Sequence, residues 1–78
     1  MKIGLVTGSV WATRKAQSLM GQTFLVVSTP AGEIVAADQV GAGKGDKVLL
    51  ITGTAAARFC MEAPVDAAVV AILDQEER

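Results

Sequence analysis

The chain has 78 residues, of which 51% are apolar and three are aromatic, and its formal net charge is −1. A domain of this size buries only about 60% of the surface that its unfolded chain exposes, so part of this apolar content must be covered by other chains or form exposed patches. The absence of histidine and the single cysteine exclude the ligand sets of structural zinc, histidine-activated nucleophiles and a disulfide within the chain.

The first half of the chain has the pattern of three strands, expected at residues 2–13, 23–29 and 34–38. Gly4 and Gly8 weaken the first strand and indicate bends or close backbone contact. The segment 14–22 is expected to be a loop whose Leu19 and Met20 form an apolar plug. Pro30 and the glycine two residues later are typical of a hairpin turn, which makes the second and third strands antiparallel.

The second half contains two further strands around a short helix. Residues 47–52 and 65–74 are apolar in their middles, which predicts strands buried on both faces. Residues 53–59 hold the good helix formers, with Thr54 as the expected N-cap, and Pro64 breaks the chain after them. The charged tail, residues 75–78, is expected to fray.

These elements predict one domain, residues 1–78, of the all-β class. Five short strands with one helical turn before the last favour a small five-stranded β-barrel, similar to the OB fold, because closure removes edges that would pair with other chains. No leader peptide or membrane-spanning run is apparent: the longest uninterrupted apolar run, residues 67–73, is too short to cross a bilayer. We therefore expect a soluble, intracellular protein.

The glycine-rich run at residues 41–46 does not fit a nucleotide site. A dinucleotide fingerprint needs a third glycine where Asp46 stands, and a P-loop needs a spacing that is absent. The carboxylates lie at strand ends, where turns favour them, so we expect no catalytic pair, no enzyme activity, no metal and no cofactor. Cys60 is expected to be a small structural hydrophobe, because the chain has no histidine to activate its thiol.

Taken together, three segments give the chain a specific resemblance, residues 36–46 (AADQVGAGKGD), 53–58 (GTAAAR) and 64–74 (PVDAAVVAILD). In this order and near this spacing, they resemble the EutN/CcmL family of pentameric vertex proteins of bacterial microcompartment shells, such as carboxysomes and metabolosomes. The resemblance implies a structural protein, located in the cytoplasm within the shell. It further implies a homopentamer that fills the corners of a polyhedral shell otherwise made of hexameric shell proteins.

A ring of five repeats every charge near its axis, and like charges about 4 Å apart cost roughly 1 kcal/mol per pair even in water. Small neutral residues should therefore line the axis, and the best candidates are Gly53, Thr54, Ala55 and Ala56. The residues expected at the subunit seam are Asp38, Val40, Gly41, Ala42, Gly43, Arg58 and Asp66. There Arg58 would pair with Asp38 or Asp66.

An alternative interpretation is a small OB-like barrel that binds single-stranded nucleic acid. Such proteins use basic grooves and several exposed aromatic side chains. With three aromatics and a net negative charge, this chain has little of either, so we expect no nucleic-acid partner and no membrane partner.

Overall fold

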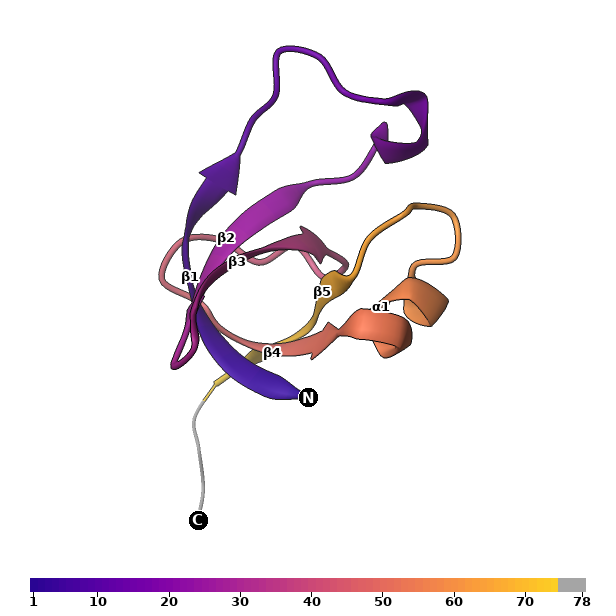
Figure 1. Cartoon of the computed structure of the whole chain (residues 1–78). Coiled ribbons are helices and arrows are strands. Elements are labelled where there is room, and N and C mark those ends of the chain that lie inside the picture. Colours follow the sequence, from indigo (N-terminus) through magenta and orange to yellow (C-terminus); the bar gives the residue numbers. More distant parts are fainter. Residues whose placement is uncertain (75–78) are drawn as a thin grey trace.

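In the computed structural model, which describes residues 1–74, five strands close into a barrel (Figure 1). This architecture confirms the all-β, five-stranded barrel expected from the sequence. Its elements in chain order are β1 (Lys2–Val10), a 3₁₀ turn η1 (Gln17–Leu19), β2 (Phe24–Thr29), β3 (Gly32–Asp38), β4 (Lys47–Thr52), α1 (Gly53–Phe59) and β5 (Ala67–Leu73).

The strand order around the barrel is β1-β2-β3-β5-β4, and β4 pairs with β1 to close it. The first three strands form an antiparallel meander, and the pairing of β2 with β3 confirms the antiparallel hairpin that the turn residues predicted. β5 lies between β3 and β4, antiparallel to β4 and parallel to β3, and the parallel pairing spans only two residue pairs. This is the strand order of the five-stranded Greek-key barrel of the OB type.

Several element boundaries differ from those expected. β1 ends at Val10 rather than at residue 13, and β5 begins at Ala67 rather than at residue 65. Thr54 is not the N-cap: it lies inside α1, and the capping position is Thr52, whose side chain makes no capping bond. The tail expected to fray lies outside the described residues.

The interior of the barrel is filled by aliphatic side chains from all five strands. Because side chains alternate between the two faces of a strand, every second residue points inward. The inward residues of the main core are Val6, Leu25, Val27, Ala36, Val48, Leu50, Ala67 and Val69. With so many valines and alanines, the core is narrow, and no aromatic side chain is needed to fill it.

The helix α1 covers part of the outside of the barrel wall. Ala56 and Cys60, four residues apart and so on one helix face, pack on the outward side chains of Ile51 and Ala68. These two residues are direct partners across β4 and β5. The upper part of this wall is therefore buried on both faces, as predicted for β4 and β5. The lower part is not fully buried on either face: the outward Leu49 and Ala71 are half-buried, and Ile72, the partner of Val48, is 43% exposed, so the prediction fails there.

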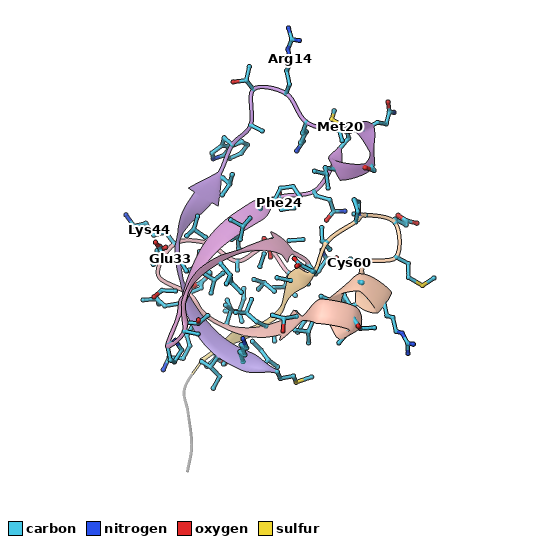
Figure 2. All side chains as sticks on the ribbon, viewed as in Figure 1. Arg14, Met20, Phe24, Glu33, Lys44 and Cys60 are labelled. Carbon is cyan, nitrogen blue, oxygen red and sulfur yellow. The ribbon has the colours of Figure 1, made fainter. Side chains whose placement is uncertain are left out.

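Residues 11–23 form an arm that rises beyond the barrel between β1 and β2, with Arg14 at its far end (Figure 2). Leu19 is half-buried, but Met20 is 61% exposed. The expected plug is therefore wrong in its second residue. Within residues 1–74, no helix is long and apolar enough to cross a membrane.

Candidate functional site

The loop after β3 is organised around one carboxylate. Asp38 Oδ1 accepts hydrogen bonds from the backbone N–H groups of Val40, Gly41 and Ala42, at 3.1, 3.1 and 3.2 Å. The backbone of Asp38 is itself fixed, because its N–H donates to Thr23 O at 2.8 Å. One half-buried side chain thus sets the path of the loop.

In the second half of the loop another carboxylate accepts a backbone hydrogen bond, and backbone hydrogen bonds join the loop to β1. Asp46 Oδ2 accepts a hydrogen bond from the N–H of Gly43 at 2.8 Å. Gly41 and Gly45 have φ values of 79° and 93°, which favour glycine. The N–H of Gly45 donates to Val6 O, and Asp46 O accepts from the N–H of Val6, both at 2.9 Å.

This arrangement leaves little for a phosphate to bind. A phosphate loop offers free backbone N–H groups, but here the donors point at the carboxylates of Asp38 and Asp46. Both carboxylates would also repel an anion. Among residues 1–74, no three His, Cys, Asp or Glu side chains group closely enough to hold a metal ion.

Only part of the segment expected at a fivefold axis is exposed on the subunit surface. Gly53, Thr54 and Ala55 are exposed at the start of α1. Ala56 is fully buried against the barrel, so its side chain cannot line an opening, and we correct that assignment. The N–H of Gly53 donates to Asp66 O at 2.7 Å, which brings the start of the helix beside the residue that precedes β5.

The residues expected at the seam lie in separate places within the subunit. Arg58 is exposed in the last turn of α1, and Asp66 is exposed just before β5. The Oδ1 atom of Asp38 is occupied inside its own loop. Of the two carboxylates considered for Arg58, Asp66 is therefore the one whose side chain remains open to a partner.

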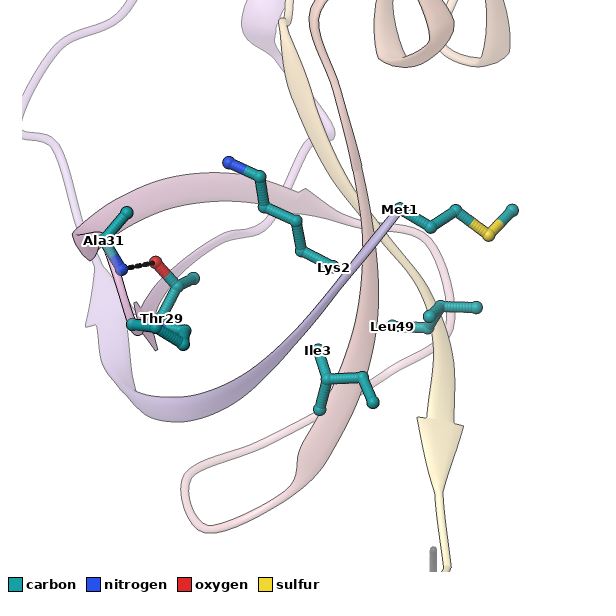
Figure 3. Close-up of a pocket in the computed structure, with 7 residues that line it drawn as sticks. Met1, Lys2, Ile3, Thr29, Ala31 and Leu49 are labelled. Atoms are coloured by element: carbon teal, nitrogen blue, oxygen red, sulfur yellow. Dashed lines mark hydrogen bonds between the residues drawn. The ribbon is translucent and has the colours of Figure 1, made fainter. Parts of the chain in front are cut away.

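A hollow of about 610 Å³ lies at the foot of the barrel (Figure 3). It is lined by Met1, Lys2, Ile3, Thr29, Pro30, Ala31 and Leu49. Apart from Lys2, none of these side chains titrates, so the hollow has no acid-base pair. It is an apolar surface rather than a reaction site.

Sequence reasoning predicted exposed apolar surface but did not locate it on β1 and β3. Ile3 and Leu5 are 44% and 46% exposed on the outer face of β1, and Val35 is 52% exposed on β3. The signal was available, because Ile3 and Leu5 alternate with the buried Gly4 and Val6. An apolar residue on both faces of a strand in so small a barrel indicates an outer face that needs a cover.

Cys60 is buried, as expected, and burial raises the pKa of its thiol. A raised pKa keeps the thiol protonated, so the reactive thiolate forms only at higher pH than in a free cysteine. We expect alkylation by iodoacetamide at neutral pH to be slower in the folded chain than in the denatured chain. Mass spectrometry over a pH series measures both rates, and equal rates would contradict this burial.

The comparisons with known proteins match this architecture over its whole length. The family described as ethanolamine utilisation protein EutN/carboxysome matches residues 1–74. This chain belongs to the EutN/CcmL family. The resemblance carried by the three sequence segments is thereby confirmed.

Relatives come from different kinds of microcompartment. The carboxysome shell vertex protein CcmL of Synechococcus elongatus is 48% identical over 95% of this chain and 84% of its own length. The shell vertex protein PduN of Salmonella typhimurium is 40% identical over 95% of this chain and 96% of its own length. A solved structure, the GrpN pentameric microcompartment shell protein from Rhodospirillum rubrum, is 38% identical, with a TM-score of 0.87 over 100% of this chain and 99% of that one.

The nucleic-acid alternative finds no support in these relatives, nor in the placement of the aromatics. Trp11 lies on the arm and Phe59 at the end of α1, while Lys15 lies 5.9 Å over the ring of Phe24. Three aromatics on three elements do not form the row of stacking platforms that single strands use.

Proposed function

We propose that this chain is a structural shell protein of a bacterial microcompartment that forms homopentamers and caps the shell vertices. The observation that carries the proposal is the match to a pentameric shell protein over the full length of both chains. The names of the curated relatives, carboxysome and microcompartment shell vertex proteins, agree with it. The partners are other copies of this chain and hexameric shell proteins, the location is the shell in the bacterial cytoplasm, and the role is not catalytic.

The physical reason for such a protein is geometric. A flat layer of hexagonal tiles cannot close into a polyhedron unless fivefold units occupy its corners. A ring of five copies needs a heterologous contact, in which two different surfaces of each subunit meet around one axis. A small barrel with apolar residues on its outer face is suited to this contact.

Co-expression with a hexameric shell protein tests this function directly. Cryo-electron microscopy should find closed shells with density at the corners when this chain is present, and open sheets or shells with empty corners when it is left out. Density for this chain within the flat facets, or no association with the shell, would overturn the proposal.

At the centre of the ring, we infer that Gly53, Thr54 and Ala55 surround the axis. All three are exposed, small and uncharged. At the seam, Val40 and the residues Gly41–Gly43 face a neighbour, with Asp38 holding their loop in shape. Arg58 pairs there with Asp66 of the adjacent copy.

Thr54→Glu tests the position of the axis. Five carboxylates brought together at one opening repel each other by roughly 1 kcal/mol per pair at about 4 Å in water, so we expect the ring to dissociate at low ionic strength. Thr54→Gln has nearly the same shape without the charge and should remain assembled. Native mass spectrometry of both variants decides, and rings of the Thr54→Glu variant that stay intact at low salt would contradict this placement.

A further inference from the structure

The arm, residues 11–23, leaves the barrel after β1 and returns to it at β2. Its returning limb, residues 16–23, is tied to the barrel. Thr23 O accepts a hydrogen bond from the N–H of Asp38 at 2.8 Å, and Gln22 Oε1 accepts one from Gln39 Nε2 at 3.4 Å. The outgoing limb, residues 11–15, makes no backbone hydrogen bond to any other part of residues 1–74. The position of the outgoing limb therefore depends on side chains.

Local hydrogen bonds shape the returning limb but do not hold the arm against the barrel. The N–H groups of Leu19, Met20 and Gln22 donate to the carbonyl oxygens of Ala16, Gln17 and Leu19, at 2.9, 3.0 and 3.2 Å. Each bond spans three residues, which is the pattern of a 3₁₀ turn and has poorer geometry than that of an α-helix. These turns open easily unless a further contact holds the arm.

Lys15 provides such a contact, because it joins the outgoing limb to the returning limb and to β2. Its Nζ donates a hydrogen bond to Gln22 O at 3.2 Å and lies 5.9 Å from the centre of the Phe24 ring. A lysine ammonium over the face of an aromatic ring is attracted by the negative potential of that face. One positive charge thus bridges the two limbs and the start of β2.

The aliphatic stem of Lys15 belongs to the wall of an apolar hollow beneath the arm. The hollow has a volume of about 270 Å³ and is lined by Val10, Ala12, Lys15, Leu19, Phe24 and Val35. A lysine stem can cover apolar surface while its charged end stays in water, and Lys15 is exposed. An arm that moved outward would take part of this wall with it and leave Phe24 and Val35 open to solvent.

The neighbouring cation, Arg14, makes no comparable contact. Figure 2 shows Arg14 at the far end of the arm, pointing away from the barrel, and Phe24 below the arm. Within the part of the chain that the structure describes, Arg14 has no hydrogen bond and no ring contact. Two adjacent residues thus carry the same charge, but only Lys15 can transmit it to the barrel.

We propose that Lys15 is a latch whose positive charge holds the arm closed over the outer face of β2. In the closed arm, the ammonium group binds Gln22 O and the Phe24 ring together. Without the charge both contacts are lost, the 3₁₀ turns open more often, and the apolar hollow beneath the arm loses one of its walls. This latch acts within one subunit, so it does not depend on the proposed homopentamer.

Hydrogen exchange followed by NMR tests the latch with three variants. Lys15→Met keeps an apolar stem without the charge, Lys15→Arg keeps a cation that also binds ring faces, and Arg14→Met is the matched control. In Lys15→Met, we expect the amides of Leu19, Met20 and Gln22 to exchange about fivefold faster than in the unchanged chain, because two weak contacts to an exposed cation are lost. Lys15→Arg and Arg14→Met should exchange at the unchanged rate.

Amides inside β2 serve as the internal reference and should keep their protection in every variant. Native mass spectrometry ensures that all four chains are compared in the same oligomeric state. Unchanged exchange in Lys15→Met would overturn the latch. Equal acceleration in Arg14→Met would overturn it too, because the effect would then follow the net charge of the arm.

Two further outcomes would also contradict the proposal. Fast exchange in Lys15→Arg would show that a positive charge at this position is not what holds the arm. Faster exchange within β2 of Lys15→Met would show that the side chain stabilises the whole barrel rather than the arm alone.

Discussion

Gly4→Ala is expected to destabilise the subunit by about 1–3 kcal/mol, and Gly4→Val by more, because overpacking a close-packed core forces side chains and backbone apart. Gly4 faces the inside of the barrel where β1 crosses between β2 and β4. An added Cβ would overlap Val27 Cγ1 and lie 3.0 Å from Ser28 O and 3.2 Å from Leu50 Cδ1. The side chains of Val27 and Leu50 are fully buried, so there is no free space into which they could move.

Urea unfolding followed by circular dichroism measures the effect. Gly8→Ala is the matched control: it lies on the same strand, at the bulge between Val6 and Gly8, and an added Cβ there meets nothing within 4 Å. The control should unfold close to the unchanged chain. Equal midpoints for Gly4→Ala and Gly8→Ala would contradict the close contact at Gly4.

Asp38→Ala is expected to cost about 1–2 kcal/mol and to loosen the loop after β3, because three backbone N–H groups lose their shared acceptor. The free-energy cost per lost hydrogen bond should lie at the lower end of its usual range, because two of the three bonds are exposed to water. Asp38→Asn keeps an acceptor oxygen without the charge and should lose about half as much.

Hydrogen exchange resolves this effect residue by residue. The amides of Val40, Gly41 and Ala42 should exchange faster in Asp38→Ala, while amides inside β2 keep their protection. Unchanged exchange at these three amides would show that the carboxylate does not hold the loop. Faster exchange throughout the barrel would show instead that the substitution destabilises the whole subunit.

The elements with sharp chemical boundaries were predictable from the sequence. The bounds of β4 and α1 are the expected ones, because an apolar run between Lys47 and Thr52 is followed at once by Gly53 and the alanines. The hairpin between β2 and β3 followed from Pro30 and the glycine after it. The all-β class and the number of strands, five, followed from the spacing of these elements.

The order of the strands was not predictable from local pattern. β5 is placed between β3 and β4 by long-range contacts, and its parallel pairing with β3 covers only two residue pairs. A pairing between residues so far apart in the chain leaves no periodic pattern in the sequence. The number of strands and the closure of their edges carried the expectation of a barrel, and the order of the strands around it is seen only in the structure.

The candidate site was predicted less well, for two physical reasons. Alanines look alike in sequence, so the buried Ala56 was grouped with its exposed neighbours, although its spacing of four from Cys60 marks a buried helix face. The bonds of Asp38 within its own loop were not predicted, although its spacing from Gly41 is that of a carboxylate that caps its own turn.

The mass of the unchanged chain in solution tests the central claim most directly. Sedimentation equilibrium should give about 40 kDa, five copies of the 8.0 kDa chain, and this mass should persist on moderate dilution. A folded monomer of 8.0 kDa under the same conditions would contradict the account, because the exposed apolar walls would then need no neighbour.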